Sequence, residues 1–201
     1  MRRHGQRQGL GQGTYSKFGE ALHWTMYDTA TLAAAPVDYS MFQTPLGGAI
    51  GAAIKTLDLT NMTLGGQIPS GQKMIVKAIK VFFCSQAVKN TANITTFYTW
   101  LSQATIRVFI SGKDAIYSKP LVEVLGIPIV WATTPTAAGD NLFTMSYGKY
   151  VGIDVLSKKI TLASNTNFEV RLSYPVALGG GNILIGDLVK VGLAGVLLRR
   201  S

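Results

Sequence analysis

The segment from Leu57 to Ser85, LDLTNMTLGGQIPSGQKMIVKAIKVFFCS, constrains the fold more than any other part of the chain. Two strand-like runs flank a middle part that contains several residues that break regular structure: Gly65, Gly66, Pro69 and Gly71. Apolar, β-branched runs separated by glycine and proline are typical of paired strands. The segment therefore predicts a β-hairpin, or two strands joined by a longer loop, with one face buried.

The second run of this segment, MIVKAIKVFF, alternates imperfectly between the two faces of a strand. Lys73, Lys77 and Lys80 do not share one parity, although successive residues of a regular strand point to opposite faces. A β-bulge inserts one extra residue and so changes which residues share a face. We predict a bulge, or a change of burial, near Ala78.

Most of the remaining chain also has the patterns of β-strands. Strand-like runs occur at Glu20–Ala35, Val37–Phe42, Ala104–Ser111, Ala115–Leu125, Lys158–Ala163, Asn167–Tyr174 and Ile183–Leu198. In Ile94–Gln103, Phe97, Trp100 and Leu101 follow helical spacing, which predicts a short helix near residues 94–103. There is no internal repeat and no βαβ alternation, so the fold class is all-β.

Turn residues indicate how some of these strands connect. Gly112 to Asp114 predicts a hairpin whose second strand carries Pro120, and a proline belongs at a sheet edge or a bulge. Ser164 to Thr166 predicts a second hairpin between residues 158 and 174, and Thr133–Asn141 has the composition of a surface loop. The last strand has no neighbour in sequence, so we expect it to pair with an early one, as in Greek-key and jelly-roll sheets.

The composition bears on the surface of the protein. Charged residues make up 14% of the chain and apolar residues 47%, whereas about 25% charged residues is usual. One explanation is a compact protein with a surface of Thr, Ser, Asn and Gln; the other is a surface covered by neighbouring copies or by lipid. The uncharged segment Leu46–Ile54 suits such a contact with a neighbouring subunit.

Residues 1–19 form a separate region with the composition of a flexible arm, followed by a domain at residues 20–201. The arm is rich in Gly and Gln, contains no acidic residue and carries four basic residues: Arg2, Arg3, Arg7 and Lys17. Such residues neutralise phosphates without reading sequence, so we expect non-specific binding to nucleic acid or to anionic lipid. Arg199 and Arg200 form a second basic cluster.

The sequence contains no pattern typical of a catalytic or metal site. The chain has two histidines, His4 in the arm and His23, and Glu20 precedes His23 at a spacing that needs a second such motif to bind a metal pair. Cys84 is the only cysteine, and we expect it in the core. We predict no enzyme activity, no metal, no cofactor and no small-molecule substrate.

The N-terminal sequence MRRHGQRQGLGQG lacks the apolar region of a secretory signal. We expect synthesis in the cytoplasm of the cell that makes the protein. No stretch has the length and apolar character of a transmembrane helix.

The chain has a basic arm, then about eight strands with loop insertions, and a long last strand. This layout resembles that of the single jelly-roll major capsid proteins of tailless icosahedral viruses. The sequence of one segment, TNMTLGGQIPSGQKMIVKAIKVFF, also resembles the early strand pair of such proteins in tailless bacteriophages. The resemblance implies two antiparallel four-stranded sheets packed face to face and a subunit that self-assembles into a virion shell. It further implies contacts with other virion proteins, and an arm that faces the genome or an internal membrane.

Another class of protein fits the same pattern of strands. A virion spike or fibre head, or another receptor- or carbohydrate-binding β-sandwich, would use the loops at Asn90–Tyr98 and Thr133–Asn141 and would remain a monomer or trimer.

Overall fold

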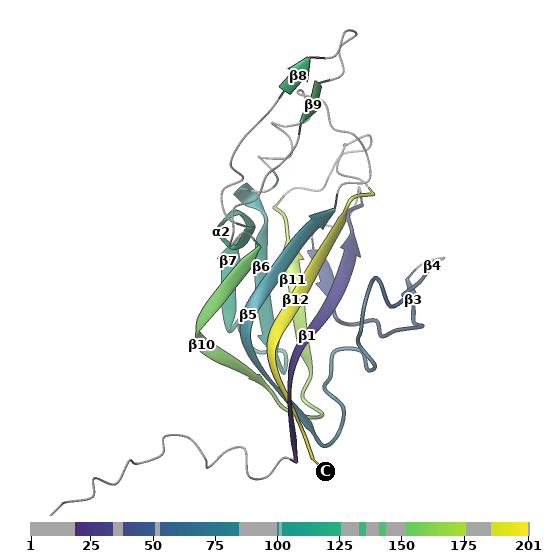
Figure 1. Ribbon diagram of the computed structural model, residues 1–201, viewed down its shortest axis with the longest axis vertical. Coiled ribbons are helices and arrows are strands. Elements are labelled where there is room, and N and C mark those ends of the chain that lie inside the picture. Colours follow the sequence, from purple (N-terminus) through teal and green to yellow (C-terminus); the bar gives the residue numbers. More distant parts are fainter. Residues whose placement is uncertain are drawn as a thin grey trace, which may run out of the picture.

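The computed structural model describes residues 19–33, 38–50, 53–84, 100, 102–125, 133–135, 141–143, 152–175 and 186–200. Strands dominate this part of the chain (Figure 1). In chain order the elements are β1 (Glu20–Thr31), β2 (Asp38–Met41), β3 (Ala49–Ile50), β4 (Ala53–Ile54), β5 (Gln72–Cys84), β6 (Thr105–Ile110), β7 (Tyr117–Pro120), α2 (Leu121–Leu125), β8 (Thr133–Pro135), β9 (Asn141–Phe143), β10 (Ile153–Leu162), β11 (Phe168–Ser173) and β12 (Leu188–Arg199).

Eight of the strands form two four-stranded sheets. Sheet A has the order β1-β12-β5-β10 and sheet B the order β2-β11-β6-β7, and every pairing within them is antiparallel. The two sheets lie face to face in Figure 1. The protein is thus an all-β sandwich of two antiparallel sheets, as the alternating runs predict.

The core lies between the two sheets and is apolar. Sheet A contributes Met74, Val76, Ile79, Val81, Val189, Val191 and Leu193, and sheet B contributes Met41, Ile106, Val108, Val170 and Leu172. Their spacing follows the two-residue period of a strand, which places alternate residues on the inner face. Burial of one such side chain stabilises the fold by about 1.5–3 kcal/mol.

A bulge interrupts the pairing of β5 with β12. Ala194 lies opposite Ala78 and Gly195 lies opposite Val76, so that Lys77 has no partner on β12. Val76 and Ile79 both belong to the core, although residues three apart on a regular strand point to opposite faces. The bulge predicted near Ala78 is confirmed.

The hairpin predicted for Leu57–Ser85 is wrong in its first half. Residues 57–71 contain no strand, and β5 begins only at Gln72. Residues 59–62 instead follow the outer edge of β1, where Asn61 Oδ1 accepts a hydrogen bond from Tyr27 N at 2.8 Å and Asn61 Nδ2 donates to Thr25 O at 2.9 Å. The Asn61 side chain thus bonds the backbone of β1 as a neighbouring strand would. The alternation of apolar and polar residues in the sequence does not predict such a contact.

The hairpin predicted between residues 158 and 174 is also wrong. β10 pairs with β5 in sheet A, whereas β11 pairs with β2 and β6 in sheet B. The predicted turn residues exist, and Asn165 has a φ of 57°, but they carry the chain from one sheet to the other. Alternation along a strand shows which face is buried, and it does not identify the neighbouring strand.

Other predicted connections are confirmed. β6 and β7 form an antiparallel hairpin, and Pro120 lies in β7 at the edge of sheet B. β12 pairs with the early strand β1 from end to end. The strand expected over Ala115–Leu125 stops at Pro120, because Leu121, Val124 and Leu125 bury one face of the short helix α2.

Two predictions concern segments that are only partly described. Trp100, Ser102 and Gln103 are helical, in agreement with the helix predicted near residues 94–103, whose other residues lie outside the described part. The surface loop predicted at Thr133–Asn141 is wrong at its ends, because β8 and β9 pair there as a small sheet that lies away from the sandwich in Figure 1. Two short strands of this kind need few apolar residues and so resemble a loop in sequence.

Candidate functional site

The predicted arm residues Arg2, Arg3, Arg7 and Lys17 lie outside the described residues. The structure does show the base from which the arm departs. Glu20 lies opposite Arg199 in the register of β1 with β12, with 3.8 Å between Glu20 Oε2 and Arg199 Nη1. The basic pair Arg199 and Arg200 therefore lies beside the start of β1, at the end of the sandwich shown at the bottom of Figure 1.

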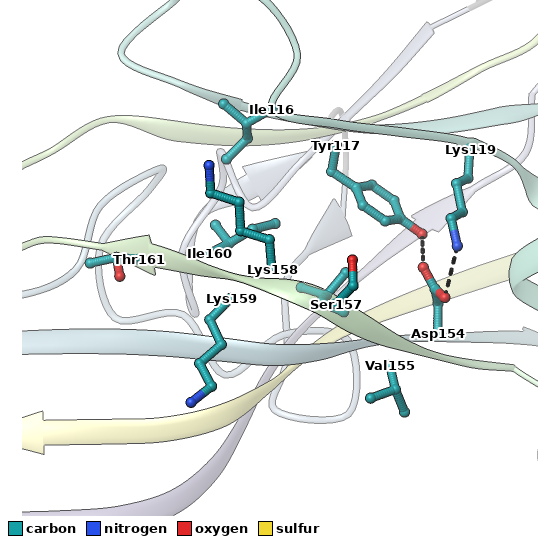
Figure 2. Close-up of a pocket in the computed structure, with 11 residues that line it drawn as sticks. Ile116, Tyr117, Lys119, Asp154, Val155, Ser157, Lys158, Lys159, Ile160 and Thr161 are labelled. Carbon is teal, nitrogen blue, oxygen red and sulfur yellow. Dashed lines mark hydrogen bonds and ion pairs between the residues drawn. The ribbon is translucent and has the colours of Figure 1, made fainter. Parts of the chain in front are cut away.

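A cavity of about 650 Å³ lies between β7 and β10, the edge strands of the two sheets. Figure 2 shows Tyr117 and Lys119 on β7 pointing toward Asp154 on β10. The Tyr117 hydroxyl donates to Asp154 Oδ2 at 2.6 Å, and Lys119 Nζ donates to Asp154 Oδ1 at 2.9 Å. These two bonds join the sheets on this side of the sandwich.

The electrostatics of this cavity do not favour acid–base catalysis. Burial, followed by the hydrogen bond to Asp154, raises the pKa of Tyr117 well above its usual value near 10, so that the phenol stays protonated at neutral pH. Both oxygens of Asp154 already accept hydrogen bonds. A general acid or base needs a pKa near the working pH, which the Tyr117 phenol does not have. This cluster fits a structural link better.

The strand β10 has an open edge beside this cavity. In the described part of the chain, β10 is the last strand of sheet A and pairs with β5 on one side, with no strand on its other side. In Figure 2, Lys158 points toward Ile116, whereas Val155 points to the opposite side of β10. Unpaired edges are the places where sheets accept further chains.

Several large apolar side chains are exposed to solvent. On the outer side of sheet A, Val155 is 76% exposed, Phe82 48% and Ile153 40%. A second group surrounds the small β3–β4 sheet and comprises Leu46, Ile54, Leu57 and Leu64. Clusters of exposed apolar residues are typical of protein–protein contacts.

The segment that carries the second group is held by a buried ion pair. Lys55 and Asp28 are 4% and 0% exposed, and Lys55 Nζ donates to Asp28 Oδ1. Asp28 Oδ2 also accepts a hydrogen bond from Phe42 N at 2.5 Å, and Phe42 has a φ of 67°. The carboxylate thus fixes both the segment after β2 and the segment after β4 on β1.

The possible Glu20–His23 motif does not form a metal site. Both residues lie on β1, and residues three apart on a strand point to opposite faces. His23 is exposed, and Glu20 lies beside Arg199. Among the described residues, no group of three or more His, Cys, Asp or Glu side chains converges.

No helix in the described ranges has the length and apolar character needed to span a membrane. Comparison of the chain with family models and with curated proteins gave no match.

Proposed function

We propose that this chain is a structural subunit that assembles with copies of itself into the shell of a tailless icosahedral virus, and that its sandwich is a single jelly roll. The order of the strands in the two sheets carries this proposal. The proposal places the protein in the virion, with synthesis in the host cytoplasm and contacts to other virion proteins. It assigns no enzyme activity.

The strand order supports the jelly roll in detail. When the strands of the two large sheets are counted along the chain, sheet A has the order 1-8-3-6 and sheet B the order 2-7-4-5. The chain therefore changes sheet at every connection except the β6–β7 hairpin. Two interleaved Greek keys of this kind are found in viral capsid proteins, and also in lectins and cupins.

Because this fold occurs in proteins of several functions, the surface residues decide which of these functions fits best. A cupin enzyme needs clustered metal-binding histidines, and the chain has two histidines, of which His23 lies on β1. Exposed Val155, Leu46 and Ile54, the position of β10 at the edge of sheet A and a charged fraction of 14% fit a subunit whose sides are covered by neighbours.

The basic charge of the arm suits binding to an anionic partner. Its basic residues Arg2, Arg3, Arg7 and Lys17 have no acidic neighbour within residues 1–19, and Arg199 and Arg200 adjoin its base. Such a region binds nucleic acid without sequence preference, and it can also bind an anionic membrane surface. In the proposed shell it faces inward to the genome or to an internal membrane.

A spike or fibre head with a receptor- or carbohydrate-binding loop is the second candidate. The small β8–β9 sheet favours it, because this sheet lies away from the sandwich at the end opposite the start of β1 (Figure 1). A protein of this class would stay monomeric or trimeric.

Sedimentation velocity and electron microscopy of the purified full-length protein distinguish the two candidates. We expect shells or large oligomers that dissociate in high salt or mild denaturant. A protein that remains a monomer at high concentration overturns the proposed shell, and a stable trimer that binds a glycan supports the second candidate.

A further inference from the structure

We propose that the outer face of sheet A binds the phosphodiester backbone of single-stranded nucleic acid, and that Lys73, Lys77 and Lys80 of β5 make the phosphate contacts. We call this surface the lysine face. It lies on the folded domain and is distinct from the arm. The proposal rests on the proposed function for the class of partner, and it assigns that partner a second, structured contact.

The bulge in β5 brings the three lysines to one face. Met74 and Val76 point into the core before the bulge, and Ile79 and Val81 point into it afterwards. Lys77 and Ala78 both lie between Val76 and Ile79, so both face outward. On a regular strand without a bulge, Lys77 and Lys80 would point to opposite faces, because they are three residues apart.

A hollow of about 340 Å³ lies on this face. Small residues, Ala78, Ala194 and Gly195, are among those that line it, together with larger polar side chains of the two flanking strands: His23, Thr25, Lys77 and Lys80. A Cβ placed on the nearby Gly192 would lie 3.0 Å from Thr25 Cγ2 and 3.5 Å from Lys80 Cβ. Side chains of β1 and β5 therefore converge over the glycine-containing strand between them.

The charge of the lysine face is not neutralised by nearby carboxylates. Among the described residues, Lys73, Lys77 and Lys80 form no ion pair. The acidic residues on the strands of sheet A have other partners: Glu20 has Arg199, Asp28 has Lys55, and Asp154 has Tyr117 and Lys119.

Two other cations on the sheets, Lys190 and Arg171, already have partners. Lys190 on β12 donates to Asp58 O, and its Nζ lies 4.9 Å from the centre of the Tyr27 ring. On sheet B, Arg171 forms an ion pair with Glu169 at 3.1 Å and lies over the Phe109 ring. The three lysines of β5 thus remain available to an external anion.

The length of the lysine row indicates a linear ligand. Lys73 and Lys80 are seven residues apart on β5, which corresponds to roughly 23 Å at about 3.3 Å per residue. A single phosphate or a small metabolite cannot contact both ends of such a row. The lysines are half-buried, so their aliphatic stems follow the sheet while the ammonium groups reach solvent.

The hollow and an exposed aromatic ring favour single-stranded nucleic acid over a membrane. A flexible phosphodiester chain can enter a hollow, whereas a flat layer of lipid headgroups contacts protruding groups. Phe82 is 48% exposed and follows Lys80 by two residues, so it faces the same way. Stacking of bases on such a ring adds affinity without sequence preference.

The test is the salt dependence of binding by the full-length protein. Fluorescence anisotropy with a labelled oligothymidylate would compare wild type with Lys77→Gln/Lys80→Gln over a range of KCl concentrations. Each phosphate contact with a single strand contributes about 0.7 to the slope of log K against log salt, so the double variant should lower the slope by about 1.4. Circular dichroism and urea unfolding confirm that the variant folds.

The matched control is Lys113→Gln/Lys158→Gln, which removes the same charge from the β6–β7 turn and from the cavity side of β10. We expect the control to retain the wild-type slope. Equal slopes for the two double variants overturn the lysine face. Binding of wild type to phosphatidylserine vesicles without binding to the oligonucleotide also overturns it, in favour of a membrane.

A third full-length variant, with Arg2, Arg3, Arg7 and Lys17 changed to Gln, separates the lysine face from the arm. We expect it to lower the slope independently, so that the two sets of changes add. If only the arm variant affects binding, the lysine face is wrong and the proposed shell still stands. If wild type forms no shell but Lys77→Gln/Lys80→Gln lowers the slope, the proposed function is wrong and the lysine face still stands.

Discussion

At the scale of single residues, Asp28 and Lys55 form a buried ion pair. Its two side chains are 0% and 4% exposed, so each charge depends on the other for solvation. A buried pair often adds little net stability over an apolar pair of the same volume, but loss of one partner is costly. Asp28 also holds Phe42 at a positive φ, which a bulky side chain rarely adopts. The pair therefore fixes position more than it adds stability.

Asp28→Asn should destabilise the protein by about 3–5 kcal/mol, because it leaves the Lys55 ammonium buried without a counter-charge. Urea unfolding followed by tryptophan fluorescence measures the loss. Adding Lys55→Met to Asp28→Asn should recover part of it. The control Asp58→Asn alters an exposed carboxylate and should change stability much less than Asp28→Asn does. Equal losses for Asp28→Asn and the control would contradict this account.

At the scale of elements, the bulge in β5 depends on a glycine in the neighbouring strand. A Cβ on Gly195 would lie 1.9 Å from Ile75 O, which is far inside van der Waals contact with a backbone atom. The bulge pushes the Ile75 carbonyl toward β12, and only glycine leaves room for it. Gly195 is thus required for the geometry that places Lys77 and Lys80 on one face.

Gly195→Ala should cost about 1–3 kcal/mol, since the added methyl group must displace backbone. The matched control is Gly192→Ala on the same strand, where the nearest atom is the movable Thr25 Cγ2 at 3.0 Å. We expect the control to lose less stability in thermal unfolding. A larger loss for Gly192→Ala than for Gly195→Ala would refute the role assigned to the bulge.

The elements also show how far sequence reasoning reaches. Alternation correctly predicted β1, β2, β6 and the long β12, because a two-residue period directly records burial on one face. The unequal parity of Lys73, Lys77 and Lys80 correctly predicted the bulge. The same pattern carries no information about neighbours, so β10 and β11 resembled a hairpin although they belong to different sheets.

The candidate site could be predicted only in part for the same reason. The parity of the lysines predicted a bulge and not the lysine face, because only the observed position of the bulge, between Val76 and Ile79, shows that the three lysines share one face. The residues that complete the hollow, His23, Thr25 and Gly195, come from strands distant in sequence and require the order β1-β12-β5. The Asn61 side chain that covers β1 has no sequence signal at all, because its partners are backbone atoms.

At the scale of the whole molecule, the exposed side chain of Val155, on the edge strand β10, should matter for assembly and not for folding. Val155→Glu should reduce the yield of shells in sedimentation velocity, because a charge would enter a covered contact in the proposed shell. Val155 is 76% exposed, so unfolding of the dissociated subunit should change by less than about 0.5 kcal/mol. Thr161→Glu, at another exposed position of β10, is the control. An undiminished yield with Val155→Glu would remove this residue from the contact.

The two flanks of sheet A differ, and the difference limits how copies can join edge to edge. On one flank the Asn61 amide occupies backbone groups of β1, whereas on the other flank the described residues place no strand beside β10. A strand whose backbone groups already have partners is a poorer template for another chain, so we expect any edge-to-edge pairing of two copies to use β10 and not the middle of β1.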